Sequence, residues 1–383
     1  MPKYDLEKYR KMFPVIEQGT VYLNHAATGP LPKRVVAAIE KYVDERSRTE
    51  IDNYASFQPV LTDTRALAAR LVNTSPDRIA FFDNTTNAIN LLASGLDWKA
   101  GDRVVLDDIE FPANVYPFLN LKRLGVEVDF VKSRGGRILL DDISAKIAPR
   151  TRLLAISHVQ FLSGYRSDLV ALGKLCKDNG IIFSVDAIQS AGVVPIDVNM
   201  MQIDFLAIGG QKWLLAPQGI AFAFISNDTQ EKIKQSHLGW TSIRNFFGDF
   251  TRYRLDLDES ARRYENGTLN YIGIASLHES LSILQEAGIS QIEAHVLDLG
   301  DTLISELSSL GIKPVIEGDR KERSGITSFS VPNSEICFAE LSRLGIAVAV
   351  REGLIRVSPH FYNTRDEILF LVKSLKEIIR KNG

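Results

Sequence analysis

The chain has 383 residues, of which 45% are hydrophobic and 24% charged, and its 45 basic and 47 acidic side chains give a formal net charge of −2 at pH 7. This composition is ordinary for a globular protein long enough for two domains, and the balanced charge excludes a strongly basic surface for nucleic acids or anionic membranes. Cys176 and Cys337 have no CxxC partner and no histidine at ligand spacing, so we expect neither a disulfide scaffold nor a metal site.

The amino terminus does not have the pattern of a targeting segment. It begins with "MPKYDLEKYRKMF", which carries charges where a signal peptide needs an apolar run. No other stretch approaches the roughly 20 apolar residues that a membrane-spanning helix needs. We therefore expect a cytoplasmic protein with no membrane partner.

Helices are predicted first along the chain, followed by alternating strands and helices. Apolar residues recur with helical spacing from Pro32 to Tyr42 and again in "RALAARLVN". Short β-rich segments then follow, separated by helical or turn segments: "RIAFF", "RVVLDD", "EVDFV", "TRLLAISHV", "GIIFSVDA" and "DFLAIGG". Strands this apolar are typical of a mostly parallel sheet covered by helices on both faces.

The pattern changes after about residue 284. A long amphipathic helix, "QIEAHVLDLGDTLISELSSLG", precedes short strands such as "ITSFSV" and "IAVAV" and a terminal helix, "RDEILFLVKSLKEIIRK". The sequence therefore predicts an α/β fold with a large domain at residues 21–283 and a smaller α+β domain at 284–383. Residues 1–20 are expected to form an arm that packs on the small domain or on a partner chain.

Polar side chains follow several of the predicted strands at their carboxyl ends, where sheets of this type bind ligands. Asp186 ends "GIIFSV", His158 ends "TRLLAIS", and Lys212 follows the Gly-Gly pair after "DFLAI". Each residue alone has a more ordinary interpretation: the aspartate could cap a helix or turn, and the lysine could be a solvated loop residue. Together, an aspartate and a shielded lysine suit pyridoxal phosphate. This cofactor needs an amine for a Schiff base and a carboxylate against its pyridine nitrogen.

The segment "DNTTNAIN" after "RIAFF" opens a helix. The free backbone N–H groups of a helix N-terminus, with the hydroxyls of Thr85 and Thr86, can bind a phosphate. A simple helix cap is the alternative interpretation. The neighbouring lysine and aspartate favour the phosphate site.

These motifs resemble the class V aminotransferases, pyridoxal-phosphate enzymes of fold type I that include cysteine desulfurases, kynureninase and isopenicillin-N-epimerase-like proteins. The resemblance runs from "VYLNHAATGPLP" to "IRVSPHFYNTRDEI" and is strongest in "SVDAIQSAG" and "GGQKWLLAPQG". It implies that Lys212 carries the cofactor as a Schiff base, that Asp186 pairs with the ring nitrogen, and that Gln189 lies near the ring's phenolic oxygen. It places the Phe111 ring on the cofactor face, although an ordinary core aromatic is the alternative there.

The same resemblance implies a homodimer with a shared active site. Gly267 and Thr268, in "RYENGTLN", correspond to residues that reach the phosphate of the neighbouring subunit. Arg356 corresponds to the arginine that binds the substrate α-carboxylate through its guanidinium fork. Asn24 and His25 are expected to lie near the substrate.

Three departures from the family pattern bear on the reaction. "REGLIRVS" holds no cysteine where desulfurases carry one on a loop, so a persulfide-forming desulfurase is disfavoured. Gln211 stands immediately before the lysine where many relatives have a histidine, and its amide is expected to donate to a phosphate oxygen instead, with the loss of one charge. "HVQF" replaces "HVSN", and Gln160 is the candidate for the ring-oxygen contact of the missing asparagine. His158 either tunes the ring or only bonds at a strand end.

We expect an enzyme that uses Lys212 as general base on a small amino acid. Transamination is the first expectation, and C–S lyase chemistry or epimerisation the alternative. A nucleotide-dependent oxidoreductase is the alternative outside this class, but no G-x-G-x-x-G turn follows an early strand. A catalytically inactive relative that binds the cofactor or an effector is disfavoured by the intact Lys212 and Asp186.

Overall fold

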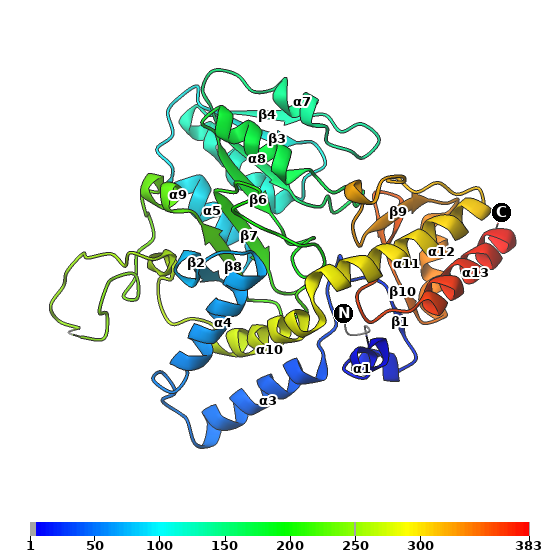
Figure 1. Ribbon diagram of the computed structural model, residues 1–383, viewed down its shortest axis with the longest axis horizontal. Coiled ribbons are helices and arrows are strands. Elements are labelled where there is room, and N and C mark those ends of the chain that lie inside the picture. Colours follow the sequence, from blue (N-terminus) through cyan, green and yellow to red (C-terminus); the bar gives the residue numbers. More distant parts are fainter. Residues whose placement is uncertain (1–4, 249, 383) are drawn as a thin grey trace.

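A seven-stranded sheet forms the centre of the large domain in the computed structural model, which describes residues 5–248 and 250–382 (Figure 1). The strand order is β2-β8-β7-β6-β5-β3-β4, and β8 alone runs antiparallel to its neighbours. The strands are β2 (Ile79–Phe82), β3 (Arg103–Asp107), β4 (Glu127–Val131), β5 (Thr151–Ser157), β6 (Ile182–Asp186), β7 (Phe205–Gly209) and β8 (Ala221–Ile225). The predicted mostly parallel α/β sheet is confirmed.

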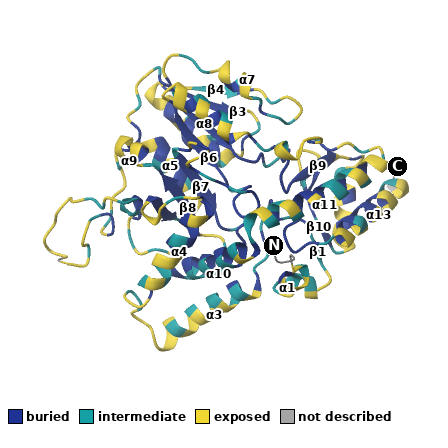
Figure 2. Cartoon of the chain, viewed as in Figure 1, coloured by how far each residue is buried: buried dark blue, intermediate teal, exposed yellow. Residues whose placement is uncertain are grey.

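Successive strand residues pack into different hydrophobic cores, which explains why the strands are almost continuously apolar. In β5, Leu154 and Ile156 belong to one core, whereas Leu153 and Ala155 belong to the other. One core contains residues of α4 (Gln58–Leu71), α7 (Leu140–Ser144), α8 (Leu169–Asp178) and α10 (Tyr271–Ala287). The other contains residues of α5 (Thr85–Gly95) and α6 (Tyr116–Leu119). Figure 2 shows the sheet as the buried interior of this domain.

The carboxy-terminal part has a separate core and its own sheets. It is built from α11 (Ile289–Ser309), β9 (Thr327–Ser330), α12 (Ser334–Arg343), β10 (Ile346–Ala347), β11 (Ala349–Arg351), β12 (Leu354–Val357) and α13 (Arg365–Asn382). Strands β11, β12 and β9 form an antiparallel sheet. The predicted strand "IAVAV" is divided: β10 pairs with β1, whereas β11 pairs with β12.

The amino-terminal arm packs against the end of the chain. Its described part comprises α1 (Leu6–Arg10) and α2 (Pro14–Glu17), and it is followed directly by β1 (Val21–Tyr22), which pairs in parallel with β10. The Phe13 ring stacks on Tyr362 with ring centroids 3.8 Å apart, and Arg10 pairs with Glu367 at 2.9 Å. The domain boundaries stay a prediction, and residues 1–4 and 383, which we assigned to the arm and the small domain, lie outside the described residues.

Helix α3 (Lys33–Arg48) lies beside α10 along the lower edge of Figure 1 and begins directly after Pro32, as predicted. Between α9 (Asn227–Lys232) and α10, a long segment extends away from the body of the molecule (Figure 1). No helix among the described residues is long and apolar enough to cross a membrane.

Two fully buried histidines, His25 and His360, lie where the chain after β1 meets both domains. Their ring centroids are 5.1 Å apart. His25 Nδ1 donates to Ser358 O and its Nε2 accepts from the Tyr362 hydroxyl, both at 2.8 Å, while His360 Nε2 donates to Trp213 O at 2.9 Å. Burial, followed by the positive charge of His360, holds the pKa of His25 well below 6.5. Burial also lowers the pKa of His360 to about 4.

We expect the free energy of unfolding to fall as the pH drops from about 6.5 to about 4, because only the unfolded chain takes up protons at these histidines in that range. The loss from His360 alone should be about 3 kcal/mol. Denaturant unfolding measured across this range should show a shallower pH dependence for His360→Gln. The exposed control His237→Gln should follow the wild type, and an equally steep curve for His360→Gln would contradict the assignment.

Candidate active site

The carboxyl ends of three neighbouring parallel strands bring Lys212, Asp186 and His158 to one edge of the sheet, where they were predicted to meet. Asp186 is the last residue of β6, His158 follows β5, and Lys212 lies three residues beyond the end of β7. His158 N donates to Asp186 O at 3.0 Å. All three residues are buried, with exposed fractions of 9% for Lys212, 2% for Asp186 and 1% for His158.

The loop after β1 packs against the turn that carries Lys212 and is hydrogen-bonded to it. Gly29 N donates to Gln211 O at 2.8 Å, and a Cβ atom on Gly29 would lie only 2.3 Å from Lys212 O. Only glycine therefore allows this close approach of the two backbones. The Trp213 indole donates to Gln189 Oε1 at 2.9 Å, which fixes the residue that follows the lysine.

Burial and mutual attraction set the protonation of Lys212 and Asp186. Burial lowers the pKa of Lys212 to about 8, an effect that the negative charge of Asp186 opposes and the positive charges of Arg356 and Arg351 reinforce. Burial raises the pKa of Asp186 to about 7, with a further increase from Glu110 and an opposing effect of Lys212. The lysine therefore loses its proton at a much lower pH than an exposed lysine, which favours the free amine that a Schiff-base lysine requires.

Phe111 covers one side of this cluster. The Lys212 Nζ atom lies 5.3 Å from the centroid of the Phe111 ring. The ring meets Phe161 edge to face at 5.3 Å and is 42% exposed, so its open face remains available to a flat ligand. The structure thus brings Phe111 to the lysine, as expected for an aromatic ring that stacks on a cofactor.

The start of α5 is where the sequence predicts a phosphate site. Asn84 caps this helix by accepting from Asn87 N, and the buried Thr85 occupies the first turn together with Thr86. The Thr85 hydroxyl is buried without a hydrogen-bond partner in the described part of the chain. A Cβ atom on Gly209 would lie 2.8 Å from both Thr85 Oγ1 and Gln211 Oε1, so these atoms converge where only a glycine leaves room. Free N–H groups and a free hydroxyl suit a phosphate.

Arg356 enters the site from the small domain. It lies on β12 with an exposed fraction of 2%, and its Nη1 donates to Phe161 O at 2.9 Å across the domain junction. Its Nε is buried without a partner. Burial, followed by the positive charge of Arg351, lowers its pKa to about 10. The guanidinium group therefore offers free donors to a carboxylate.

A buried carboxyl pair, which the sequence analysis missed, fixes the orientation of Gln160. Gln160 Nε2 donates to Asp107 Oδ2 at 2.9 Å and to Glu110 Oε1 at 3.0 Å, while its Oε1 is buried without a partner. Burial and the charge of Glu110 raise the pKa of Asp107 well above its ordinary value. Since the amide nitrogen serves the carboxyl pair, Gln160 presents an acceptor and no second donor. The ring-oxygen contact proposed for it stays a prediction.

Glu110 could have been suspected from the sequence, because it directly precedes Phe111 at a predicted strand end. Asn114, whose Nδ2 donates to Glu110, lies only four residues further along the chain. The contacts with Ser157, whose backbone N–H and hydroxyl both donate to Glu110, could not be predicted because Ser157 comes from a distant segment.

The structure gives His25 and Gln189 supporting positions. Both ring nitrogens of the fully buried His25 are hydrogen-bonded, which leaves neither for a substrate and does not support the expected substrate contact. Gln189 Nε2 donates to Ala26 O at 3.0 Å and its Oε1 accepts from Trp213, so its amide also joins segments of the protein. Asn24 pairs with Ser358 in a parallel bridge, and its buried Oδ1 has no partner.

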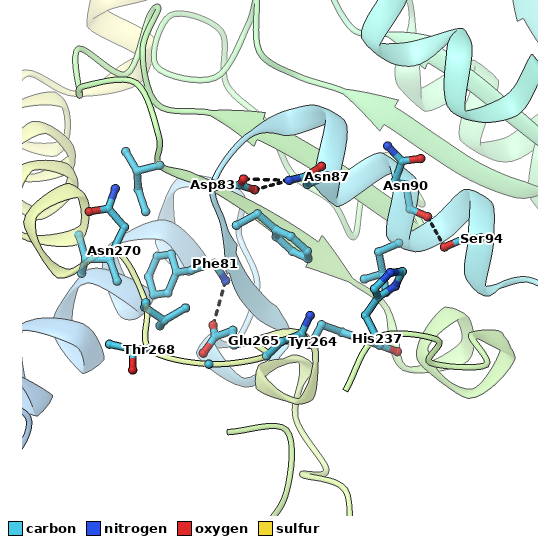
Figure 3. A pocket seen from close by; sticks show the side chains of 17 residues that line it. Phe81, Asp83, Asn87, Asn90, Ser94, His237, Tyr264, Glu265, Thr268 and Asn270 are labelled. Atoms are coloured by element: carbon cyan, nitrogen blue, oxygen red, sulfur yellow. Dashed lines mark hydrogen bonds between the residues drawn. The ribbon is translucent and has the colours of Figure 1, made fainter. Parts of the chain in front are cut away.

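Gly267 and Thr268 line a cavity of about 610 Å³, whose lining residues include neither Lys212 nor Asp186. The preceding loop is fixed by Glu265, which pairs with Arg65 at 2.6 Å and accepts from Phe81 N at 2.9 Å. Figure 3 shows the cavity, with Thr268 and Asn270 at one side and Asp83 and Asn87 of the α5 start at another.

The site contains buried polar atoms that are not hydrogen-bonded within the described part of the protein and could bond to pyridoxal phosphate. Among the described residues, buried side-chain atoms without a hydrogen-bond partner occur at the start of α5, after the strands β5 and β1, and on β12: Thr85 Oγ1, His158 Nδ1, Gln160 Oε1, Asn24 Oδ1 and Arg356 Nε. Buried polar groups are rarely left unpaired in folded proteins, so this grouping indicates a ligand site. The donor set fits a phosphate at one end, a protonated ring nitrogen at Asp186 and an amino-acid carboxylate at Arg356.

Comparisons with known proteins extend over nearly the whole chain. Residues 21–371 match the model of the family described as Aminotransferase class-V. The chain is 32% identical to a probable cysteine desulfurase of Methanothermobacter thermautotrophicus, covering 97% of this chain and 98% of that protein. An apo structure of a cysteine desulfurase from Thermococcus onnurineus is 26% identical with a TM-score of 0.89, covering 98% of both chains. Another solved structure is a lysine-to-alanine mutant of C-DES with glycine covalently linked to its PLP cofactor. It is 24% identical with a TM-score of 0.88, covers 96% of this chain and 98% of that one, and shares the fold.

Proposed function

The chain belongs to the class V aminotransferase family and is a pyridoxal-phosphate-dependent enzyme, and on this premise we propose that it cleaves the C–S bond of a sulfur-containing amino acid by β-elimination. The sequence alone favoured transamination, with C–S lyase chemistry as the alternative. The relatives named for removing sulfur from cysteine support that alternative.

The positions of the two cysteines carry this proposal. Cys176 lies on α8 in the core of the large domain, where burial raises its pKa to about 12. Cys337 lies on α12 in the small-domain core, and its Sγ contacts Pro332 O at 3.6 Å. The chain contains no other cysteine. Because both thiols are buried outside the site, sulfur has no protein acceptor and must leave with its own substituent.

The side chains of the site have complementary parts in this reaction. Arg356 binds the α-carboxylate, and Thr85, Thr86 and the α5 N-terminus hold the phosphate. Asp186 keeps a proton on the ring nitrogen. When bound, pyridoxal phosphate withdraws electrons from the amino acid attached through its aldehyde.

The bond changes require no oxidant and no co-reactant other than water. Lys212 takes the Cα proton as general base, and the electron pair of the C–H bond forms a Cα–Cβ double bond while the Cβ–S bond breaks. The sulfur leaves as a thiolate and takes up a proton. The remaining three-carbon enamine tautomerises and hydrolyses in water to pyruvate and ammonia.

Product analysis tests the proposal. The purified protein with pyridoxal phosphate should convert cystine or S-alkylcysteines to equal amounts of pyruvate and ammonia without any keto acid, and Cys337→Ala should leave this rate unchanged. Product that forms only with a keto-acid acceptor would establish transamination instead. Alanine formed from cysteine together with protein-bound sulfane sulfur would establish desulfuration and overturn the proposal.

We also retain the predicted homodimer with a shared site. Gly267 and Thr268 face a cavity outside the site of their own chain, which suits contact with a neighbouring phosphate. The extended segment between α9 and α10 exposes aromatic side chains, and Figure 2 shows it exposed over most of its length. These residues are Trp240, Phe247, Phe250 and Tyr253. A second copy of the chain would cover such a surface. The cytoplasmic location stays a prediction.

A further inference from the structure

Two arginines lie on the same face of the small-domain sheet. Strands β11 and β12 are antiparallel, with Ala349 opposite Arg356 and Arg351 opposite Leu354. Residues opposite each other, and residues two apart on one strand, share a face of the sheet. The pairing therefore places Arg351 on the face of Arg356. The other face carries Ile355, which packs into the small-domain core.

The hairpin that carries Arg351 has a tight two-residue turn. Glu352 and Gly353 connect the two strands with φ angles of 48° and 76°. Positive φ at both central residues is typical of the hairpin turn whose twist matches that of its strands. In the sequence analysis this segment was notable only for lacking the desulfurase cysteine. Its geometry instead positions an arginine at the edge of the site.

Arg351 lies close enough to the reacting groups for its charge to act on them. After burial and the charge of Arg356, the charge of Arg351 lowers the pKa of Lys212 further. After burial, Arg351 also lowers the pKa of Arg356. A guanidinium group in solvent, far from the site, would be screened from both.

No carboxylate among the described residues lies within 4.0 Å of either arginine as an ion-pair partner. Arg351 Nη1 donates to its own neighbour Val350 O at 2.7 Å, and Arg356 Nη1 donates to Phe161 O. Asp186 is the carboxylate whose charge acts on Lys212. The substrate α-carboxylate can neutralise one guanidinium group and leaves the other for a second anion.

We propose that Arg351 binds a second negatively charged group on the substrate, so that the enzyme prefers amino acids whose sulfur substituent carries a carboxylate or sulfonate. This inference rests on the proposed C–S cleavage for the position of that group, beyond the sulfur atom. The shared chemistry is an anionic oxygen group that a guanidinium fork can bind through two N–H donors. Arg351 is exposed and lies on the sheet face of Arg356, a position that suits the distal end of a substrate.

A pair of substrates that differ by one charge tests the inference kinetically. S-carboxymethyl-L-cysteine and S-carbamoylmethyl-L-cysteine have nearly the same shape. The wild type should favour the carboxylate at least tenfold in kcat/KM, mainly through KM, and Arg351→Gln should reduce this ratio to about 1. Arg343→Gln, an exposed arginine on α12 of the same domain, is the matched control and should keep the wild-type ratio. A ratio near 1 in the wild type, or an unchanged ratio in Arg351→Gln, would overturn the inference.

Binding of unreactive acids separates this inference from the proposed reaction. Glutarate and glutaramate lack the α-amino group and differ only in one carboxylate, so their dissociation constants can be measured by calorimetry on the holoenzyme. Glutarate should bind at least tenfold more tightly to the wild type and with no preference to Arg351→Gln. If this difference holds while no C–S bond is cleaved, the proposed function fails and the role of Arg351 stands. Equal binding of the two acids to the wild type would overturn the role of Arg351 even where cleavage is observed.

Discussion

Lys212→Ala should lower kcat/KM by about 10⁴-fold, equivalent to about 5 kcal/mol of transition-state stabilisation. The substitution removes both the amine that attaches the cofactor and the base that takes the Cα proton. The free energy of unfolding should not fall, because Lys212 is 9% exposed and alanine removes the cost of burying its charge. Steady-state kinetics, denaturant unfolding and the absorbance of the bound cofactor measure these effects.

Two controls test whether the loss of activity is specific to Lys212. Lys234→Ala changes an exposed lysine of the same domain, which pairs with Asp97 at 3.0 Å, and should retain wild-type kinetics. Borohydride reduction of the wild-type holoenzyme followed by peptide mapping should place the label on Lys212. A label on another lysine, or activity of Lys212→Ala within tenfold of the wild type, would show that the site is assigned to the wrong residue.

Asp186→Asn should lower kcat by about 10³-fold, or about 4 kcal/mol, while KM changes little. Asparagine has the shape of aspartate but no charge, so it cannot hold a proton on the ring nitrogen. Arg356 would still bind the α-carboxylate, which is why the loss should appear in kcat. Since the Asp186 charge raises the pKa of Lys212, the asparagine variant should also lower that pKa further.

Asp186→Glu provides the comparison for this second prediction. It keeps the charge at a displaced position and should recover part of the lost kcat, whereas a purely structural role would make the longer side chain the more damaging change. Because Asp186 is 2% exposed and its Oδ1 accepts from Ile188 N at 2.9 Å, unfolding measurements must accompany the kinetics. An effect confined to KM would contradict the role assigned to the carboxylate.

The sheet and its strand-end residues could be predicted because both depend on local pattern. Continuous apolar strands between helices specify a covered parallel sheet, and parallel strands bring their carboxyl ends to one edge. For that reason the sequence alone indicates that Lys212, Asp186 and His158 lie close together. The position of Thr85 at the start of α5 could be predicted for the same reason, since it depends on one strand-to-helix turn, and the phosphate contact there stays a prediction.

The remaining parts of the site depend on contacts between distant segments, which no local pattern reveals. His25 was expected near the substrate, but Ser358 and Tyr362 occupy both of its ring nitrogens. Gln160 was expected at the ring oxygen, but the carboxyl pair of Asp107 and Glu110 takes its amide nitrogen. A role for Arg351 could be proposed only from the strand pairing, which places it on the same face of the sheet as Arg356.

The pairing of β1 with β10 has a consequence for how the protein is made. Val21 and Tyr22 leave the ribosome early, whereas their partners Ile346 and Ala347 are translated only after the whole large domain. The large domain can therefore complete its sheet during synthesis, but the arm must wait for the last part of the chain. Premature termination before β10 would leave an unpaired strand edge and the apolar Leu23 exposed, which are features that promote aggregation and recognition by chaperones.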